Sequence, residues 1–385
     1  MTTKIGLLFL MLTSAFLGFS QTPNFKIQVV DNQINIGYGL AIGDVDGDRK
    51  PDILLADQKE IVWYRNGDWK RFVMAANLTE RDNVCIAARD IDGDGRVEVA
   101  VGAQWNPAET NDLTKSGAVF YLIRPNDPTQ RWEAVQLPHE ITTHRMKWVK
   151  VAPEKFQLIV APLHGLGNAN GEGKGVKIMA YDVPKNPREA WPRQIVDSTL
   201  HLTHNFDVQE QEDQTYLIIA SKEGNKIVAH RNGKWVDTKK MGGNDGSGEV
   251  RLGKLATPFY AAIEPLHGNK LVIYAPLENR YKDTLSSNLS QGHALICADF
   301  LGIGSSQIAV GWRNPNADKK VGVRLFVPQD KTGEKWQEFA LDETVMMACE
   351  DLQAADLDND GDLDLVASGR STLNVLIYWN QLKNK

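Results

Sequence analysis

The chain has 385 residues, of which 42% are hydrophobic and 24% charged, a composition typical of a soluble globular protein and not of a disordered or fibrous one. The formal net charge of −6 offers no excess of positive charge to neutralise a phosphate backbone or an anionic membrane, which argues against nucleic acid and membrane partners. Length alone leaves either one large all-β domain or two to three ordinary domains open.

The first twenty residues predict export. Lys4 is followed by the apolar run 5–19, which contains small residues near its end and gives way to a polar stretch. This layout is typical of a secretory signal peptide, and the run is shorter than the roughly 20 residues needed to cross a bilayer. We therefore expect residues 1–20 to be a signal peptide and residues 22–385 to form a periplasmic or extracellular domain.

Three cysteines are present, so they cannot all pair with one another. Cys85, Cys297 and Cys349 each stand in a short apolar segment. We expect buried free thiols and no disulfide framework.

The chain repeats a strand, an acidic turn and a β-branched strand. Four segments align on an aspartate, at Asp44, Asp90, Asp299 and Asp356. Three weaker copies keep the strand rhythm without the acidic turn, at 149–161, 206–220 and 252–263. Most units continue into a third strand and a Trp-rich fourth. Seven units of four strands predict an all-β fold, a seven-bladed β-propeller.

The outer strands predict how the ring closes. Six candidates are present, at 69–75, 132–137, 191–196, 234–239, 280–285 and 335–341. The last unit ends at Trp379 without one, and we expect residues 25–30 to supply it. A ring closed by strands from both chain ends exposes no sheet edge that could template aggregation.

The acidic turns, each followed by apolar residues and a small Ala or Gly, resemble the FG-GAP (VCBS) repeats of integrin-like seven-bladed propellers. The resemblance implies the propeller fold over the mature chain. It leaves the function open, because such propellers serve as adhesion modules, lectins and enzymes.

Three of the turns are predicted calcium sites. Carboxylates occupy positions 1, 3, 5 and 9 of each, namely Asp44, Asp46, Asp48 and Asp52, then Asp90, Asp92, Asp94 and Glu98, then Asp356, Asp358, Asp360 and Asp364. Hard oxygen ligands at alternating positions suit calcium, which would stiffen the blades. The alternative is an ordinary solvated acidic turn. The turn at Asp299 lacks the other carboxylates, so no metal is expected there.

Histidines recur where the innermost strands begin, close to the propeller axis. Counting back from the aligned aspartates places Tyr38, His144, His201, His293 and Glu350 at equivalent positions, and His204 lies in the same inner segment as His201. His164 and His267 follow second strands, each in a Pro-Leu-His-Gly sequence. A lone histidine is more often a satisfied polar residue than a catalyst, but six on one funnel predict a site.

Other polar and aromatic residues fall at strand ends on the same side of the predicted ring. These are Trp105, Lys222, Trp312, Arg313 and Arg370. They predict a sugar-binding surface, although Trp-containing turns are also ordinary turn chemistry. The Gly-rich insertion 165–175 lacks the ending of a phosphate-binding loop and is expected to cover the pocket.

The residue types at the axis favour elimination chemistry. No Gly-x-Ser-x-Gly elbow or Ser-His-Asp arrangement is visible. Histidine or tyrosine can remove a proton next to a carbonyl or carboxylate, while cations stabilise the enolate that forms. Clustered neutral imidazoles could instead hold a divalent metal such as zinc or magnesium in that role.

Four motifs, His144-Arg-Met-Lys-Trp, Pro162-Leu-His-Gly, His201-Leu-Thr-His-Asn-Phe-Asp and Pro265-Leu-His-Gly, resemble the propeller of aldos-2-ulose dehydratase. The chain is also similar to rhamnose-glucuronate lyases. Both families eliminate across a sugar ring bond. This chain departs from the dehydratase by ending with the propeller, without the cupin domains, which puts the accompanying isomerisation in doubt.

We therefore expect an exported carbon–oxygen lyase acting on a keto-sugar, such as 1,5-anhydrofructose or an aldos-2-ulose, or on a uronate-containing glycan. His144, His201, His204, His293 and Tyr38 are the predicted acid/base or metal-binding residues. Substrate contacts are expected from His164, His267, Trp105, Lys222, Trp312, Arg313, Glu350 and Arg370. The alternative is a non-catalytic integrin-like or lectin propeller that binds a glycan or a protein. The oligomeric state stays open.

Overall fold

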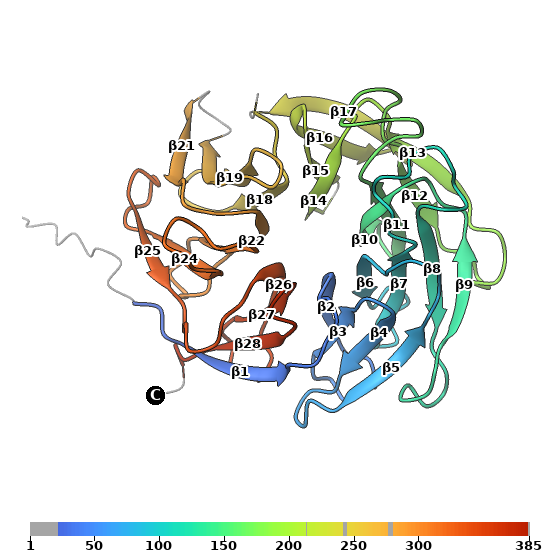
Figure 1. Cartoon of the computed structure of the whole chain (residues 1–385), viewed down its shortest axis with the longest axis horizontal. Coiled ribbons are helices and arrows are strands. Elements are labelled where there is room, and N and C mark those ends of the chain that lie inside the picture. The colour runs from blue at the N-terminus through green and yellow to red at the C-terminus, as the bar shows by residue number, and fades with distance from the viewer. Residues whose placement is uncertain (1–21, 213, 242–244, 276–279, 384–385) are drawn as a thin grey trace, which may run out of the picture.

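Seven four-stranded antiparallel sheets stand in a ring around one axis (Figure 1). The structure is a computed structural model that describes residues 22–212, 214–241, 245–275 and 280–383. Within these residues every regular element is a strand. The predicted all-β, seven-bladed β-propeller is confirmed.

The strands occupy four tiers from the axis outward. The innermost strands are β2 (Gly39–Gly43), β6 (Cys85–Arg89), β10 (Thr143–Ala152), β14 (Thr203–Glu210), β18 (Glu249–Gly253), β22 (Gly292–Ala298) and β26 (Cys349–Ala355). The second strands are β3 (Asp52–Ala56), β7 (Glu98–Ala103), β11 (Lys155–Pro162), β15 (Thr215–Ser221), β19 (Phe259–Glu264), β23 (Gln307–Trp312) and β27 (Asp364–Gly369). The third strands are β4 (Glu60–Tyr64), β8 (Ala118–Ile123), β12 (Ile178–Asp182), β16 (Gly224–Arg231), β20 (Lys270–Ala275), β24 (Gly322–Pro328) and β28 (Val375–Asn380). The outermost strands are β5 (Arg71–Ala76), β9 (Glu133–Leu137), β13 (Arg193–Asp197), β17 (Lys234–Met241), β21 (Arg280–Ser286), β25 (Trp336–Ala340) and β1 (Phe25–Asp31).

The ring is closed by the strand nearest the N-terminus. β1 pairs antiparallel with β28, with Phe25 opposite Asn380 and Val29 opposite Leu376. Figure 1 shows β1 lying along the outside of the blade formed by β26, β27 and β28. The predicted closure by residues 25–30 is therefore confirmed.

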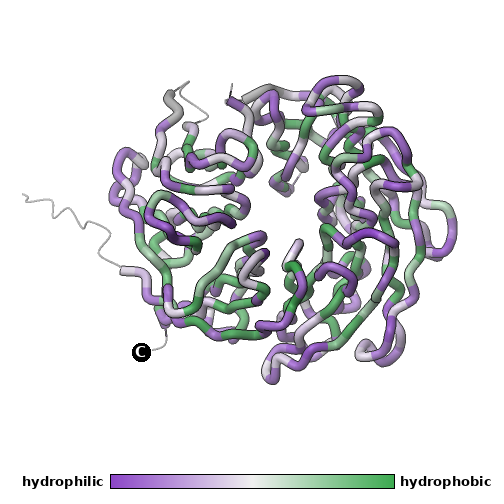
Figure 2. The backbone as a smooth tube through the Cα atoms, viewed as in Figure 1, coloured by the Kyte–Doolittle hydropathy of each residue, from purple (hydrophilic) through white to green (hydrophobic). Residues whose placement is uncertain are grey.

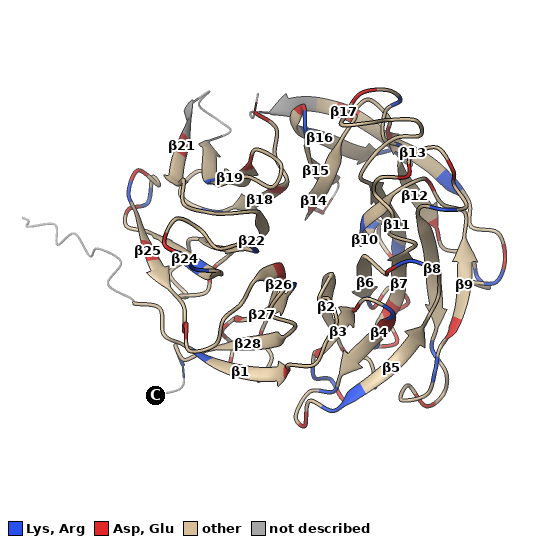
Figure 3. Ribbon diagram, in the orientation of Figure 1, with Lys and Arg blue, Asp and Glu red and all other residues tan. Residues whose placement is uncertain are grey.

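The core lies between the blades, because each sheet buries both faces against its neighbours. Seven clusters of buried apolar residues are found in the described part of the chain. One contains Trp63 of the first blade and Val99 of the second, both fully buried. The hydrophobic segments in Figure 2 accordingly follow the strands, and many loops are hydrophilic. Charged residues of both signs are interspersed around the ring (Figure 3).

All three cysteines are free thiols, as predicted. Cys85 and Cys349 are buried as predicted, whereas Cys297 is partly exposed. Burial raises the pKa of Cys85 to about 12, so its thiol stays protonated near neutral pH. These residues fill space between strands.

Among the described residues, no helix is long and apolar enough to span a membrane. The predicted signal peptide, residues 1–20, lies outside the described residues.

Candidate metal centre and active site

Four imidazoles meet at the axis, at the end of the ring where the inner strands begin. His144, His204 and His293 lie in β10, β14 and β22, and His267 lies in the loop after β19. The ring centroid of His204 is 4.5 Å from that of His267 and 4.8 Å from that of His293, and the rings of His267 and His293 are 5.0 Å apart. His144 packs against His204 at 4.6 Å. The structure therefore joins four of the six predicted histidines.

Hydrogen bonds to backbone carbonyls fix the tautomers of three of these rings. The Nδ1 atom of His144 lies 2.9 Å from His204 O, that of His204 lies 2.9 Å from Gly248 O, and that of His293 lies 2.6 Å from Glu350 O. A carbonyl can only accept, so each Nδ1 carries the proton. The lone pair of each ring is left on Nε2, which is how metal-binding histidines are oriented by their second hydrogen bond.

The Nε2 atoms of His204 and His267 lie 2.7 Å apart. Because Nε2 of His204 carries no proton, either His267 donates a proton to it or a cation stands beside both atoms. Ligand nitrogens of His204, His267 and His293 all fall within 4.8 Å of one another. This donor set fits a divalent metal with a preference for imidazole, such as zinc.

Burial keeps these imidazoles neutral. It lowers the pKa of His144, His204 and His293 well below the usual value, and that of His267 to about 2. The guanidinium of Arg145 adds to the effect on all four, and that of Arg313 adds to it on all but His144. A ring this hard to protonate is a poor general base, whereas neutral imidazole is the form that binds metals. The environment therefore favours ligation over proton transfer for His204, His267 and His293.

A charged group adjoins the histidines. Glu350, only 3% exposed, accepts hydrogen bonds from Arg313 (3.2 Å) and Arg370 (3.1 Å) and lies 3.8 Å from Nε2 of His293. The guanidinium of Arg370 lies over the ring of Tyr38 at 5.4 Å. Tyr38 donates its hydroxyl to Asp82 (3.1 Å), and burial together with the Asp82 charge raises its pKa, so the phenol stays protonated.

His201 stands apart from the four buried imidazoles and forms a different arrangement. Its Nδ1 atom lies 2.7 Å from Oε1 of Glu223, and its side chain is 39% exposed. The Nε2 atom has no hydrogen bond to any described residue, so a carboxylate-oriented imidazole presents a free nitrogen. The 165–175 insertion packs against this segment, because Asn168 donates to His201 O (2.7 Å) and Lys222 donates to Asn170 O (3.0 Å).

Two predicted contact residues have other roles. Trp312 is 2% exposed, belongs to the apolar cluster between two blades, and donates its indole N–H to Lys320 O. It cannot offer a face to a sugar, so the prediction of a platform there is wrong, because the last residue of β23 turns into the blade interface. Trp105 instead stacks on His144 at 4.9 Å. His164 is in an isolated bridge with Leu202, outside the imidazole group.

Sequence reasoning missed Glu249, Arg145 and Glu223. Glu249 is fully buried, with Oε1 3.3 Å from Nδ1 of His204, and it accepts from Asn205. The fifth unit has no acidic turn to align on, so counting from an aspartate could not reach Glu249. Glu223 follows a second strand and stands next to Lys222. Its position beside that predicted contact residue was the one feature of the sequence that could have indicated it.

The acidic turns bring their first three carboxylates together. Ligand oxygens of Asp44, Asp46 and Asp48 lie within 4.8 Å of one another, and the same holds for the corresponding groups at Asp90, Asp92 and Asp94 and at Asp356, Asp358 and Asp360. The carboxylate at position 9 of each turn accepts hydrogen bonds from backbone N–H groups. Asp52 accepts from Val45 N and Asn66 N, Glu98 from Ile91 N, and Asp364 from Leu357 N and Asn380 N.

Two models of known protein families match parts of this chain. Residues 116–276 match the family model of the aldos-2-ulose dehydratase β-propeller domain. Residues 44–101 match the FG-GAP-like repeat. The dehydratase match spans His144, His201, His204 and His267. A search of curated proteins found no match to this chain.

Similar solved structures show the fold alone. A chain in the crystal structure of BBS1N in complex with ARL6DN, soaked with mercury, is 14% identical, with a TM-score of 0.56 over 92% of this chain and 96% of that chain. A chain in the crystal structure of the mitotic checkpoint complex is 12% identical, with a TM-score of 0.57 over 98% of this chain and 99% of that chain.

Proposed function

We propose that this protein is a carbon–oxygen lyase that acts on a keto-sugar or a uronate-containing glycan by proton abstraction and β-elimination. The observation that carries the proposal is the group of imidazoles of His204, His267 and His293, whose ligand nitrogens converge within 4.8 Å. The match of residues 116–276 to a dehydratase propeller domain supports the same reaction class.

The metal-binding groups would be Nε2 of His204, His267 and His293. A divalent ion held there, with zinc favoured by imidazole ligands, would supply a Lewis acid for the carbonyl or carboxylate next to the carbon that loses its proton. Arg370 is 40% exposed on its side chain, so it keeps donors available for a substrate carboxylate.

The base is assigned to His201. Its Nε2 atom is free, and Glu223 holds the ring through Nδ1 and stabilises the imidazolium that forms. In the elimination the C–H electron pair becomes the new C=C bond as His201 takes the proton, and the β C–O bond breaks. Tyr38, which stays protonated, is the proposed proton donor to the departing oxygen.

The test is an elimination assay. Purified protein is incubated with 1,5-anhydrofructose, an aldos-2-ulose and a uronate glycan, with zinc or magnesium or with a chelator, and ultraviolet absorbance from an enone or unsaturated uronate is followed. We expect absorbance to rise with one substrate class, and to be lost in His204→Gln. His139→Gln, a histidine away from the site, is the matched control and should retain full activity.

The assay also distinguishes a lyase from a non-catalytic binding propeller. Saturable binding of a glycan without any new absorbance, under every metal condition, would replace the lyase proposal with a lectin-type propeller. Activity that persists in His204→Gln and in His201→Ala would show that elimination occurs elsewhere on the protein.

A further inference from the structure

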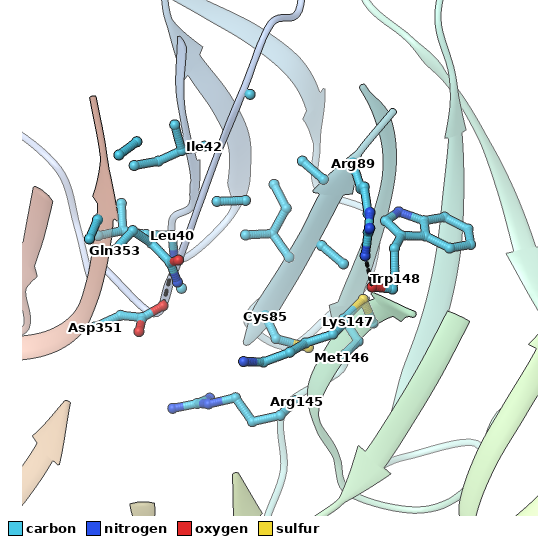
Figure 4. A pocket seen from close by; sticks show the side chains of 18 of the residues that line it. Leu40, Ile42, Cys85, Arg89, Arg145, Met146, Lys147, Trp148, Asp351 and Gln353 are labelled. Carbon is cyan, nitrogen blue, oxygen red and sulfur yellow. Dashed lines mark hydrogen bonds between the residues drawn. The ribbon is translucent and has the colours of Figure 1, made fainter. Parts of the chain in front are cut away.

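A cavity of about 430 Å³ lies among the inner strands and is lined by residues of β2, β6, β10 and β26, together with Asn205 of β14 and Arg251 of β18 (Figure 4). None of the histidines lines it. Its lining runs from Leu40, Cys85 and Arg145 to the far ends of the same strands, at Gly43 and Arg89. The cavity therefore extends along the inner strands, from Arg145 next to the imidazole group toward the opposite end of the ring. Its volume is within the range of small-molecule sites.

Arg145 is a buried cation without a carboxylate partner. It is 9% exposed, and its guanidinium donates to His144 O at 3.1 Å. No described carboxylate lies within ion-pair distance of it. Buried charges in proteins are normally paired, because an uncompensated one loses its hydration without replacement. Figure 4 shows the guanidinium of Arg145 extending into the cavity.

Lys147 projects beside Arg145, two residues further along β10. Alternate residues of a strand share a face, and in Figure 4 both side chains extend in the same direction. The ammonium of Lys147 lies 5.7 Å from the ring of Phe206 and has no hydrogen bond or ion pair with any described residue. Burial, with the nearby charge of Arg251, lowers its pKa to about 8, although the carboxylates of Asp207, Glu249 and Asp351 act in the opposite direction. An anion bound directly to the ammonium would offset the remaining penalty.

The other charged residues that line the cavity are already satisfied. Arg251 pairs with Glu249 at 3.0 Å, and Arg89 pairs with Glu210 at 2.6 Å. The one lining carboxylate, Asp351, accepts hydrogen bonds from Leu40 N (2.8 Å) and Leu352 N (2.9 Å). Burial raises the pKa of Asp351, and the charge of Arg145 acts in the opposite direction without a direct ion pair. Arg145 and Lys147 are thus the two cations in the cavity that lack a bonded counter-charge among the described residues.

We propose that this cavity binds a small oxyanion, a carboxylate or a phosphate group, between Arg145 and Lys147. Guanidinium supplies paired donors that match the oxygens of either group, and ammonium adds a point charge. Asn205, 6% exposed, also lines the cavity, but its amide nitrogen already donates to Glu249, so the two cations carry the proposal. The site uses different residues from the proposed lyase centre and does not depend on its activity.

The test is isothermal titration calorimetry on the full chain with inorganic phosphate, with glucuronate, and with glucose as the neutral control. We expect saturable binding of phosphate, glucuronate or both, and none of glucose. Lys147→Met and Arg145→Met keep side-chain volume while removing charge, and each should weaken binding by tenfold or more. Lys150→Met removes an exposed lysine from the same strand, β10, and should leave the affinity unchanged.

The two anions distinguish the source of the ligand group. Binding of phosphate alone assigns a phosphate or phosphate ester, and binding of glucuronate alone assigns a sugar acid or other carboxylate. Arg313→Met tests the other end of the ring. Loss of binding in Arg313→Met but not in Lys147→Met would place the anion at the imidazole group and overturn the proposal, as would no saturable binding to the wild type. If thermal melts show that Arg145→Met is unfolded, Lys147→Met decides.

Discussion

The Nδ1 atoms of His144, His204 and His293 each bond a backbone carbonyl of the next blade, or of the residue just before it. His144 reaches His204 O in β14, His204 reaches Gly248 O just before β18, and His293 reaches Glu350 O in β26. These three histidines are each the second residue of an inner strand, so the prediction that His201 is the equivalent in the fourth blade is wrong, because β14 begins at Thr203. The recurrence of histidine at this strand position has a structural cause, which is a tether between neighbouring blades. The same tether directs Nε2 of His204 and His293 into the proposed metal-binding group.

Metal content tests the ligand assignment directly. After incubation with zinc and gel filtration, we expect the wild type to retain bound zinc because His204, His267 and His293 present neutral imidazoles. His267→Gln should lose that zinc, and the matched variant His139→Gln should keep it. The measurement is elemental analysis of the purified protein, so it does not need a known substrate. Equal zinc in both variants would contradict the assignment.

Glu223 is a positioning residue in the proposed mechanism, because it acts on the substrate only through His201. Glu223→Gln should lower kcat, with KM little changed, since the substrate itself does not contact Glu223. His201→Ala should cost about 10²- to 10⁴-fold in rate, the usual contribution of a general base. Steady-state kinetics on the substrate identified by the elimination assay measure both. A change confined to KM would indicate a binding role instead.

Trp312 and Trp105 are expected to respond differently to truncation. Trp312→Ala leaves a cavity between two blades and should destabilise the protein by about 3–5 kcal/mol, the usual cost for a buried aromatic. Trp105→Ala should cost less stability, since Trp105 is only partly buried, and it should alter the imidazole group through its stacking on His144. Chemical denaturation with circular dichroism compares the two variants. A larger stability loss in Trp105→Ala would contradict the burial argument.

At the scale of elements, the acidic turn is built around its first aspartate. Asp44 accepts from Gly47 N and Arg49 N, and Asp299 accepts from Ile303 N and Gly304 N in the same way. The backbone N–H groups that Asp299 satisfies are a sufficient reason for an aspartate at the degenerate turn. Arg49 has a φ of 68°, where the equivalent Gly95 has 84°, so the first turn keeps this conformation with an arginine.

Calcium binding by the three acidic turns stays a prediction. A chelator should lower the melting temperature, because an ion that binds only the folded state adds about 2.7 kcal/mol at 100 times its Kd. Asp358→Asn with Asp360→Asn should reduce the response to calcium by removing two carboxylates from one turn. Ser305→Ala, in the turn that lacks the other carboxylates, is the control and should leave the response unchanged. Differential scanning calorimetry with and without calcium measures these shifts, and identical melts in calcium and chelator would exclude structural calcium.

At the scale of the whole molecule, the ring depends on one strand pairing. Phe25 of β1 packs in the cluster between the sixth and seventh blades, with its ring 6.4 Å from that of Phe300. Without β1 the backbone of β28 would present an open edge, which is a template for association between chains. Closure therefore bears on both stability and solubility.

Phe25→Ala should lower the free energy of unfolding by about 3 kcal/mol. Lys26→Ala changes an exposed residue of the same strand and should stay within about 0.5 kcal/mol of the wild type. Urea denaturation measures the stability, and light scattering on storage should rise in Phe25→Ala alone. Equal midpoints for the two variants would show that β1 contributes little to closure.

The fold could be predicted from the sequence because each blade carries its own strand and turn pattern, and this pattern repeats along the chain. Each turn at Asp44, Asp90 and Asp356 marks one blade, and the missing fourth strand after Trp379 pointed to residues 25–30. Boundaries matched to within a few residues where a tryptophan begins an outer strand. Glu249 was not predicted because the fifth blade has no acidic turn from which its position could be counted.

By itself the sequence determined the number of blades, the closing strand, the free thiols and the clustering of histidine near the axis, because strand period and turn chemistry act between near neighbours. The tertiary structure alone decided which histidines meet. His204 and His267 are 63 positions apart, and their Nε2 contact depends on the rotation of one blade against the next. It also decided that Trp312 is buried and that no carboxylate of the described residues lies within ion-pair distance of Arg145, since burial and pairing are set by groups brought together only when the ring closes.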